Sequence, residues 1–111
     1  MNTVKLFTVA EAFQISGRGC VLAKGVPVDA GLPDVQVGSA IRLVKPNGES
    51  IDTWIDGIEM MNYGRRIPEK LYIPISLPRI ILKQDVPPGT HVFLLMTETE
   101  RLSANKSFKR M

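Results

Sequence analysis

Cysteine is nearly absent from this sequence, since Cys20 is the only one among 111 residues. A single thiol can form neither an intrachain disulfide nor a multi-cysteine metal site, so nothing indicates an oxidising compartment. The sequence also lacks a run of about 20 apolar residues, which a membrane-spanning helix requires. Polar and charged residues interrupt the first twenty positions, which therefore do not form a signal peptide. We expect a soluble, cytoplasmic protein that does not contact membranes.

Residue types that commonly carry catalysis are scarce as well. His91 is the only histidine, and no serine or cysteine pattern accompanies it. We find no metal-ligand cluster, no nucleophile with a base and no convincing carboxylate pair. No Gly-x-x-x-x-Gly-Lys-Ser/Thr phosphate loop occurs in the sequence. The sequence therefore predicts no enzyme activity, no nucleotide hydrolysis, no metal and no cofactor.

Positive charge is concentrated at one end of the chain. The formal net charge is +3, but the last eleven residues contain no acid and four bases, namely Arg101, Lys106, Lys109 and Arg110. Residues 1–97 are expected to form one folded domain, and residues 98–111 a polar, basic extension. Such an extension would attract any polyanion, with an affinity that falls as salt rises.

Alternating apolar and polar residues predict strands, and no segment shows convincing helical periodicity. Residues 7–15 are expected to form one strand whose inward row is Phe7, Val9, Glu11, Phe13 and Ile15. Further strands are expected in CVLAKGV, AIRLV, SIDTWIDGIEMM, residues 71–77, RIILK and THVFLLM.

Glycine and proline predict the interruptions between and within these strands. Asn47 and Gly48 favour a tight hairpin turn, because both tolerate positive φ. A bulge at Gly57 would keep the later apolar residues of its strand on the inward face. Pro74 indicates an edge strand or a bulge, because proline donates no backbone hydrogen bond.

Six or seven such strands predict an all-β sandwich or a closed barrel. We favour the barrel, because a small sheet with an apolar inner face must either close or expose an edge.

Four segments carry a resemblance to a known family. FQISGRGCV, VGSAIRLV, IDGIEM and ILKQDVPPGTHVF follow one another in an order and at spacings similar to those of the β-barrel second domain of the translational GTPases, such as elongation factor Tu. The resemblance covers residues 7–93. It implies a closed, antiparallel Greek-key barrel of six or seven strands. The nucleotide-binding domain of those GTPases is not part of this sequence.

The resemblance also implies an RNA site. Positions matching Glu59, Glu11 and Phe13 lie near the 3′ end of the aminoacyl-tRNA acceptor arm in elongation factor Tu. This chain differs at Asn62, where bacterial relatives have arginine, and at Ala12, where they have a second acid. Alternatively, Glu59 pairs with Arg18 or Lys83, and Phe13 fills the core.

Other candidate residues also have two interpretations each. In Gly17-Arg18-Gly19 the glycines permit a sharp turn, and Arg18 either bonds nearby carbonyls or faces a phosphate. Trp54 projects from the barrel as an anchor for a protein or a base, unless the loop at residues 62–70 covers it. Arg65 and Arg66 in that loop either bind a phosphate backbone or are simply solvated.

Two classes of function follow. In the first, the chain is a non-catalytic binding module that docks on tRNA, ribosomal RNA or a translation factor through Glu59, Phe13 and Arg18, with Arg65, Arg66 and the extension adding charge. In the second, it is an accessory or inhibitory protein that binds another protein through Trp54 and residues 62–70. A fold alone does not decide between them.

Overall fold

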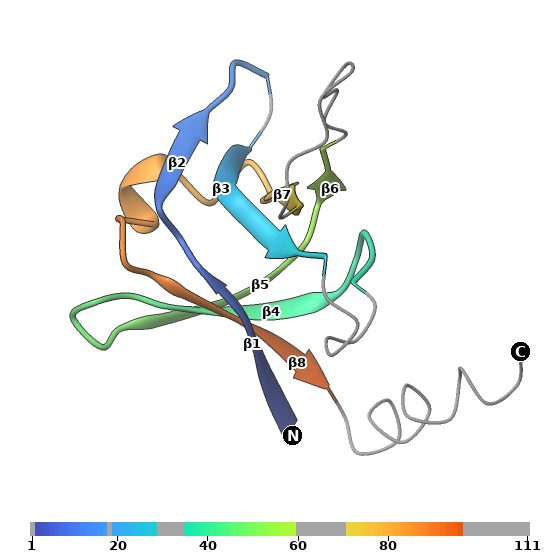
Figure 1. Ribbon diagram of the computed structural model, residues 1–111. Helices are drawn as coiled ribbons and strands as arrows, with labels where there is room; N and C mark the ends of the chain where they lie inside the picture. Colours follow the sequence, from blue (N-terminus) through green and yellow to red (C-terminus); the bar gives the residue numbers. More distant parts are fainter. Residues whose placement is uncertain (1, 18, 29–34, 60–70, 97–111) are drawn as a thin grey trace, which may run out of the picture.

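A computed structural model describes residues 2–17, 19–28, 35–59 and 71–96. These residues form strands and one short 3-10 helix, shown in Figure 1. The elements are β1 (Asn2–Thr8), β2 (Glu11–Gln14), β3 (Cys20–Pro27), β4 (Ala40–Val44), β5 (Ser50–Trp54), β6 (Gly57–Ile58), β7 (Tyr72–Ser76), η1 (Lys83–Asp85) and β8 (His91–Met96). The prediction of an all-β protein is confirmed.

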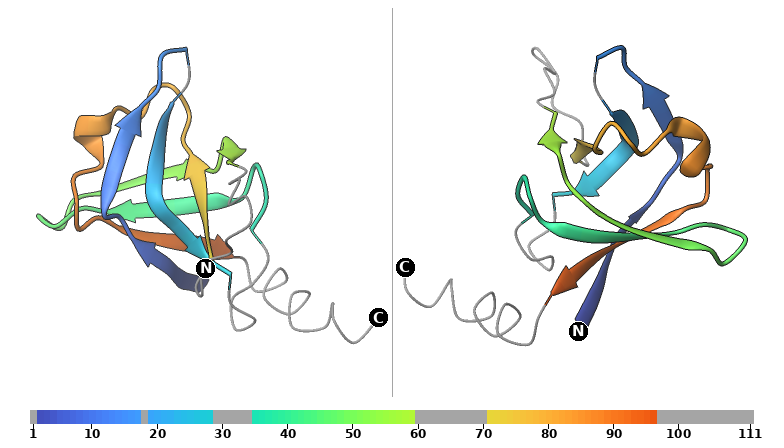
Figure 2. Two further views of the ribbon diagram at one scale, coloured as in Figure 1. Left: turned by 45° about the horizontal axis from the view of Figure 1, so that its top comes forward. Right: turned by 180° about the vertical axis from the view of Figure 1, so that it is seen from behind.

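The strands form two antiparallel four-stranded sheets, in the orders β1-β8-β4-β5 and β2-β3-β7-β6. Figure 2 shows the strands of one sheet crossing those of the other at a steep angle. Within the described parts of the chain, the strands are not joined into one continuous hydrogen-bonded ring.

The chain passes between the two sheets four times, and two of these passages, β1 to β2 and β5 to β6, each form backbone hydrogen bonds with neighbouring strands. At the passage from β1 to β2 the Val9 amide donates to the carbonyl of Thr90 (2.8 Å), and the next amide, Ala10, donates to Ala23 (2.9 Å). At the passage from β5 to β6, Ile55 donates to Ser39 (3.0 Å) and Asp56 donates to Ser76 (2.9 Å). Each of these two passages is therefore bonded to both sheets.

The core lies between the two sheets. Apolar side chains from both inner faces fill it, and the fully buried ones include Leu22, Ile41, Leu43, Ile55, Ile75, Leu77 and Val92. Burying this apolar surface is the main term that stabilises the fold. The expected strands CVLAKGV, AIRLV and THVFLLM correspond to β3, β4 and β8.

The predicted single strand over residues 7–15 is wrong. β1 ends at Thr8 and β2 begins at Glu11, because the chain changes sheets between them. This passage moves the inward row by one residue. Val9 and Ala12 are buried, whereas Glu11 and Phe13 are exposed.

Gly57 and Pro74 lie on the neighbouring strands β6 and β7 of one sheet. The inward row at Thr53 and Ile55 is confirmed, but Gly57 begins β6 in the second sheet and pairs with Ser76. β7, which contains Pro74, lies between β3 and β6 and is not an edge strand. The register of β3 against β7 shifts between Leu22 and Val26, opposite Pro74. Of the two expectations for Pro74, an edge strand or a bulge, the structure therefore agrees with an irregularity in the strand pairing.

The segment RIILK is not a strand, contrary to prediction. The chain turns after Leu77, and the Ile81 amide donates to the Pro78 carbonyl (2.9 Å). The Leu82 amide donates to the Asp85 carboxylate (2.8 Å) as η1 begins. Ile81 is buried, but Ile80 is 77% exposed and Leu82 is 44% exposed. Local turns therefore supply the backbone hydrogen bonds of this segment, although its apolar side chains predicted a strand.

The hairpin between β4 and β5 contains the predicted turn, with a different conformation. Of the two turn residues, Asn47 and Gly48, only Gly48 has positive φ (93°). Asn47 contributes through its side chain instead, since its Oδ1 accepts a hydrogen bond from the Glu49 amide (2.9 Å). The predictions for Arg18, Arg65, Arg66 and the extension at residues 98–111 fall outside the described residues.

Candidate functional site

Two of the predicted site residues lie on the outer face of the β2-β3-β7-β6 sheet. The strand register places Phe13, Val21, Ser76 and Gly57 in one row across the four strands. A Cβ atom built on Gly57 would lie 4.0 Å from Oε2 of Glu59, so this carboxylate stands over the end of the row. Three strand spacings separate the two edges, which is about 14 Å.

Glycine at position 57 permits this arrangement. A Cβ atom there would lie only 2.5 Å from Oγ of Ser76, too close for an ordinary contact. The Glu59 amide donates to the Pro74 carbonyl (2.9 Å), which fixes the backbone beside β7. Glu59 is half-buried as a result.

Phe13 does not fill the core, which corrects one of the sequence-based alternatives. Its side chain is 46% exposed, because it points outward from the edge strand β2. Arg18, one of the two expected ion-pair partners of Glu59, lies outside the described residues.

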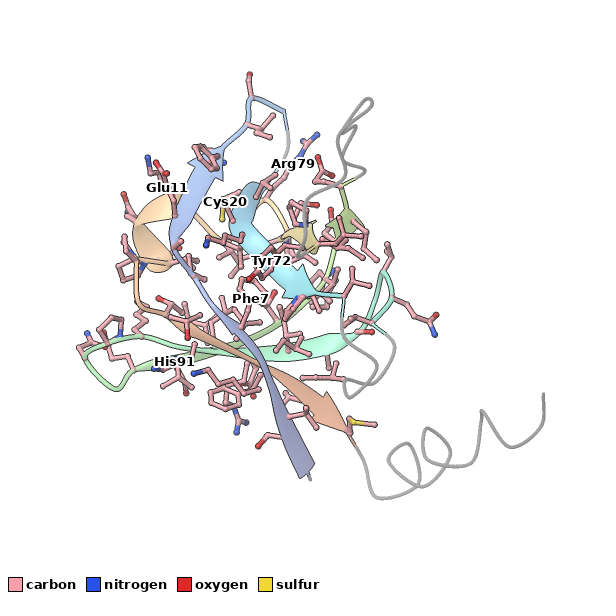
Figure 3. The ribbon with its side chains drawn as sticks, viewed as in Figure 1. Phe7, Glu11, Cys20, Tyr72, Arg79 and His91 are labelled. Atoms are coloured by element: carbon pink, nitrogen blue, oxygen red, sulfur yellow. The ribbon has the colours of Figure 1, made fainter. Side chains whose placement is uncertain are left out.

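Glu11 lies at a separate depression, at the open edge of β2. This depression has a volume of about 550 Å³ and lies between β2 and η1, with Glu11, Lys83 and Val86 among its lining residues. Figure 3 shows Glu11 beside the 3-10 helix. The Lys83 amide donates to Oε1 of Gln14 (3.1 Å), which ties η1 to β2. Sequence reasoning missed this depression because it expected a strand at residues 79–83.

The glycines of the Gly17-Arg18-Gly19 motif are required by the backbone. Gly17 has a φ of 78°, which side-chain-bearing residues rarely adopt. A Cβ atom on the buried Gly19 would lie 1.7 Å from the Leu77 carbonyl oxygen. The Leu77 amide in turn donates to the Cys20 carbonyl (2.9 Å). The motif thus lets the β2–β3 connection pack against the end of β7.

Exposed apolar side chains flank the same connection. Phe13, Ile80 and Leu82 are 46%, 77% and 44% exposed. The hydrogen bond from Lys83 to Gln14 brings the segment that carries Ile80 and Leu82 next to β2. The sequence did not predict this apolar surface, again because residues 79–83 were expected to form a strand.

Trp54 belongs to the other sheet. It is 46% exposed on the outer face of β5, as the alternation predicted. The loop that was considered as its cover, residues 62–70, lies outside the described residues. The structure therefore separates Trp54 from the face that carries Phe13 and Glu59.

The side chains of Cys20 and His91 each contact neighbouring residues of the fold. Cys20 is fully buried and its Sγ donates to the Ile81 carbonyl (3.7 Å), so it behaves as a small core residue. Burial raises the pKa of its thiol, which keeps it protonated. Nδ1 of His91 lies 3.0 Å from Oγ1 of Thr8.

In the described part of the chain, no group of three or more His, Cys, Asp or Glu side chains could hold a metal ion. The same residues contain no helix with the length and apolar character needed to cross a membrane. In comparisons with known proteins, no family model, no curated protein and no solved structure matches the chain.

Proposed function

We propose that this protein is a non-catalytic RNA-binding module that works in translation, with tRNA or ribosomal RNA as its ligand. One observation carries the proposal: Phe13 and Glu59 lie on the same outer face of the β2-β3-β7-β6 sheet, at its two edges. An exposed aromatic ring can stack on an unpaired base, and a carboxylate can accept hydrogen bonds from a base amino group or a 2′-hydroxyl.

The fold in this proposal is the closed Greek-key barrel of the second domain of translation factors. Two of the passages between the sheets, β1 to β2 and β5 to β6, support it, because each is bonded to both sheets. In a barrel, such corners carry strands from one side to the other. The proposed module hydrolyses no nucleotide, needs no cofactor and works in the cytoplasm.

The proposal is tested by titrating the full-length protein with purified tRNA. We expect binding that weakens as salt rises, and about tenfold weaker binding for Phe13→Ala and for Glu59→Gln. Val37→Ala is a matched control, because Val37 is 62% exposed and lies outside the row. Absence of binding to both tRNA and ribosomal RNA, or equal binding by all four proteins, would contradict the proposal.

A protein partner is the second candidate function. The exposed side chains of Phe13, Ile80 and Leu82 favour it, because large apolar side chains that gather on a surface commonly mark a protein interface, and the hydrogen bond from Lys83 to Gln14 brings their segments together. In this case the chain is an accessory or inhibitory protein, and the sheets serve as a scaffold. It would replace the first proposal if RNA binding is absent and Ile80→Ser abolishes association with a purified protein partner.

A further inference from the structure

The outer face of the β1-β8-β4-β5 sheet carries a row of side chains that the site above does not use. The register places Lys5 of β1 opposite Phe93 of β8, and Phe93 opposite Arg42 of β4. Arg42 in turn lies opposite Asp52 of β5. One partly exposed aromatic ring therefore has a cationic residue on each side.

A second aromatic ring adjoins this row. His91 lies two residues before Phe93 on the same face, and the ring centroids are 6.4 Å apart at an interplanar angle of 63°. The 3.0 Å contact between Nδ1 of His91 and Oγ1 of Thr8 fixes the imidazole orientation. In Figure 3, His91 lies on the sheet formed by β1, β8, β4 and β5.

Arg42 is held by Asp52 but keeps part of its donor capacity. Its Nε and Nη2 atoms donate to the two carboxylate oxygens of Asp52, at 2.6 and 2.9 Å. A guanidinium group has five N–H donors, so this pair leaves donors that can reach a phosphate. A guanidinium plane held in this way can also stack on a base.

Trp54 extends the same face. It lies two residues beyond Asp52 on β5, so both side chains project from one side of the sheet. Its indole is 46% exposed. Trp54 therefore adds an exposed ring on the edge strand of this face, and Asp52 contributes a negative charge beside Arg42.

We propose that this face, defined by Lys5, Phe93, His91, Arg42 and Trp54, is a stacking platform for single-stranded RNA. The exposed Trp54 and the partly exposed Phe93 and His91 offer stacking surface to unpaired bases, and the flanking cations neutralise the phosphodiester backbone. A duplex hides its base faces, so it cannot use the rings. The platform is on a different sheet from Phe13 and Glu59, so it stands whether or not that site binds RNA.

The test is a fluorescence titration of the full-length protein with a short oligouridylate. Trp54 is the only tryptophan, so the intrinsic signal reports on this face alone. We expect binding to quench it. Phe93→Leu keeps an apolar side chain but removes the ring, and we expect about tenfold weaker binding. Lys5→Gln is expected to weaken binding and to reduce the salt slope by about one.

Controls separate the platform from the rest of the chain. Lys24→Gln removes an exposed lysine from the other sheet and is expected to leave the affinity unchanged. A variant with Lys106, Lys109 and Arg110 changed to Gln measures the contribution of the basic extension. An RNA duplex of the same length is expected to compete poorly with the oligouridylate.

Several results would overturn the proposal. These are no binding of oligouridylate, binding without a change in Trp54 fluorescence, or equal affinity in Lys5→Gln and the parent protein. Loss of binding in Phe13→Ala together with full binding in Phe93→Leu would place the RNA on the other sheet. Lys5 is exposed, so Lys5→Gln keeps the test decisive even if Phe93→Leu fails to fold.

Discussion

At the scale of single residues, glycines determine where two backbone segments can approach each other. Gly25 has a φ of 103°, and a Cβ atom there would lie 2.2 Å from the carbonyl oxygen of Ile73. Gly48 has a similar φ of 93°, but a Cβ atom there would meet nothing within 4 Å. Comparing substitutions at the two positions therefore distinguishes the cost of a positive φ from the cost of steric overlap.

Gly25→Ala is expected to destabilise the fold much more than Gly48→Ala. The strain of a positive φ alone costs about 1–2 kcal/mol, which is the loss expected for Gly48→Ala. At Gly25 the overlap with the backbone of β7 adds to this strain, so we expect a loss of at least about 3 kcal/mol. Chemical denaturation of both variants measures the difference. Equal losses of stability in the two variants would contradict this, because they would show that β3 and β7 can move apart without an energetic cost.

Cys20 is expected to be unreactive in the folded protein. Burial raises its pKa, so the thiol stays protonated near neutral pH and reagent cannot reach it. The folded protein thus favours the neutral thiol of Cys20. Because the folded pKa is raised, the stability that comes from burying this neutral thiol is complete below the thiol pKa of the unfolded chain and is lost as pH rises through the folded pKa. Labelling with a thiol reagent should therefore follow unfolding, and rapid labelling of the native protein would contradict the buried position.

At the scale of elements, the apolar run of residues 79–83 illustrates what sequence patterns can miss. The side chains of Ile80 and Ile81 are chemically identical, yet they are 77% and 6% exposed. Ile81→Ala is expected to cost about 2–4 kcal/mol, because it leaves a cavity in the core. Ile80→Ala is expected to change stability by less than about 0.5 kcal/mol. Thermal or urea unfolding distinguishes them, and similar losses would favour a strand in which both side chains are packed.

The Arg42–Asp52 pair joins β4 to β5 and is expected to depend on pH. The hydrogen bonds from Arg42 lower the pKa of the Asp52 carboxyl. The pair therefore stabilises the hairpin above the pKa that Asp52 has in the unfolded chain, and this contribution is lost as pH falls through the lowered folded value. Both side chains are solvent-accessible, so the effect is small.

An NMR titration of the Asp52 carboxyl measures this effect. In Arg42→Gln the Asp52 pKa should rise toward its ordinary value. In Lys5→Gln, where the altered residue is two strands from Arg42, the pKa should stay nearly unchanged. An Asp52 pKa that does not respond to Arg42→Gln would contradict the bidentate pair.

Strands with uninterrupted patterns could be predicted from the sequence, and passages between sheets could not. β3, β4 and β8 were predicted because their apolar residues are local in the sequence. The passage at Val9 and Ala10 was missed, because alternation continues through it while the backbone changes its bonding partners. Residues 79–83 were assigned to a strand because an apolar run does not reveal turns.

The same limit applies to the candidate sites. Trp54 was predicted to project outward from alternation alone, and it does. Phe13 and Glu59 were selected by a resemblance, and their placement on one outer face depends on pairings that the sequence does not encode locally. The row of Lys5, Phe93 and Arg42 was missed entirely, because it needs the register of three strands that are far apart in the chain.

At the scale of the whole molecule, two sheets enclose one core, and each has an outer face that carries partly or fully exposed side chains. One outer face carries Phe13 and Glu59, and the other carries the platform around Phe93. The formal net charge of +3 favours a polyanionic partner without specifying which face it meets. The proposed RNA-binding function depends on the face with Phe13 and Glu59.

An NMR titration of the isotope-labelled full-length protein with purified tRNA tests whether this face binds RNA. The backbone signals of Phe13, Ser76, Gly57 and Glu59 are expected to shift together and to saturate with one affinity. The signal of Val37, which lies outside the row, should stay in place. Shifts confined to the basic residues of the extension at 98–111, or no shifts at all, would contradict RNA binding at this face.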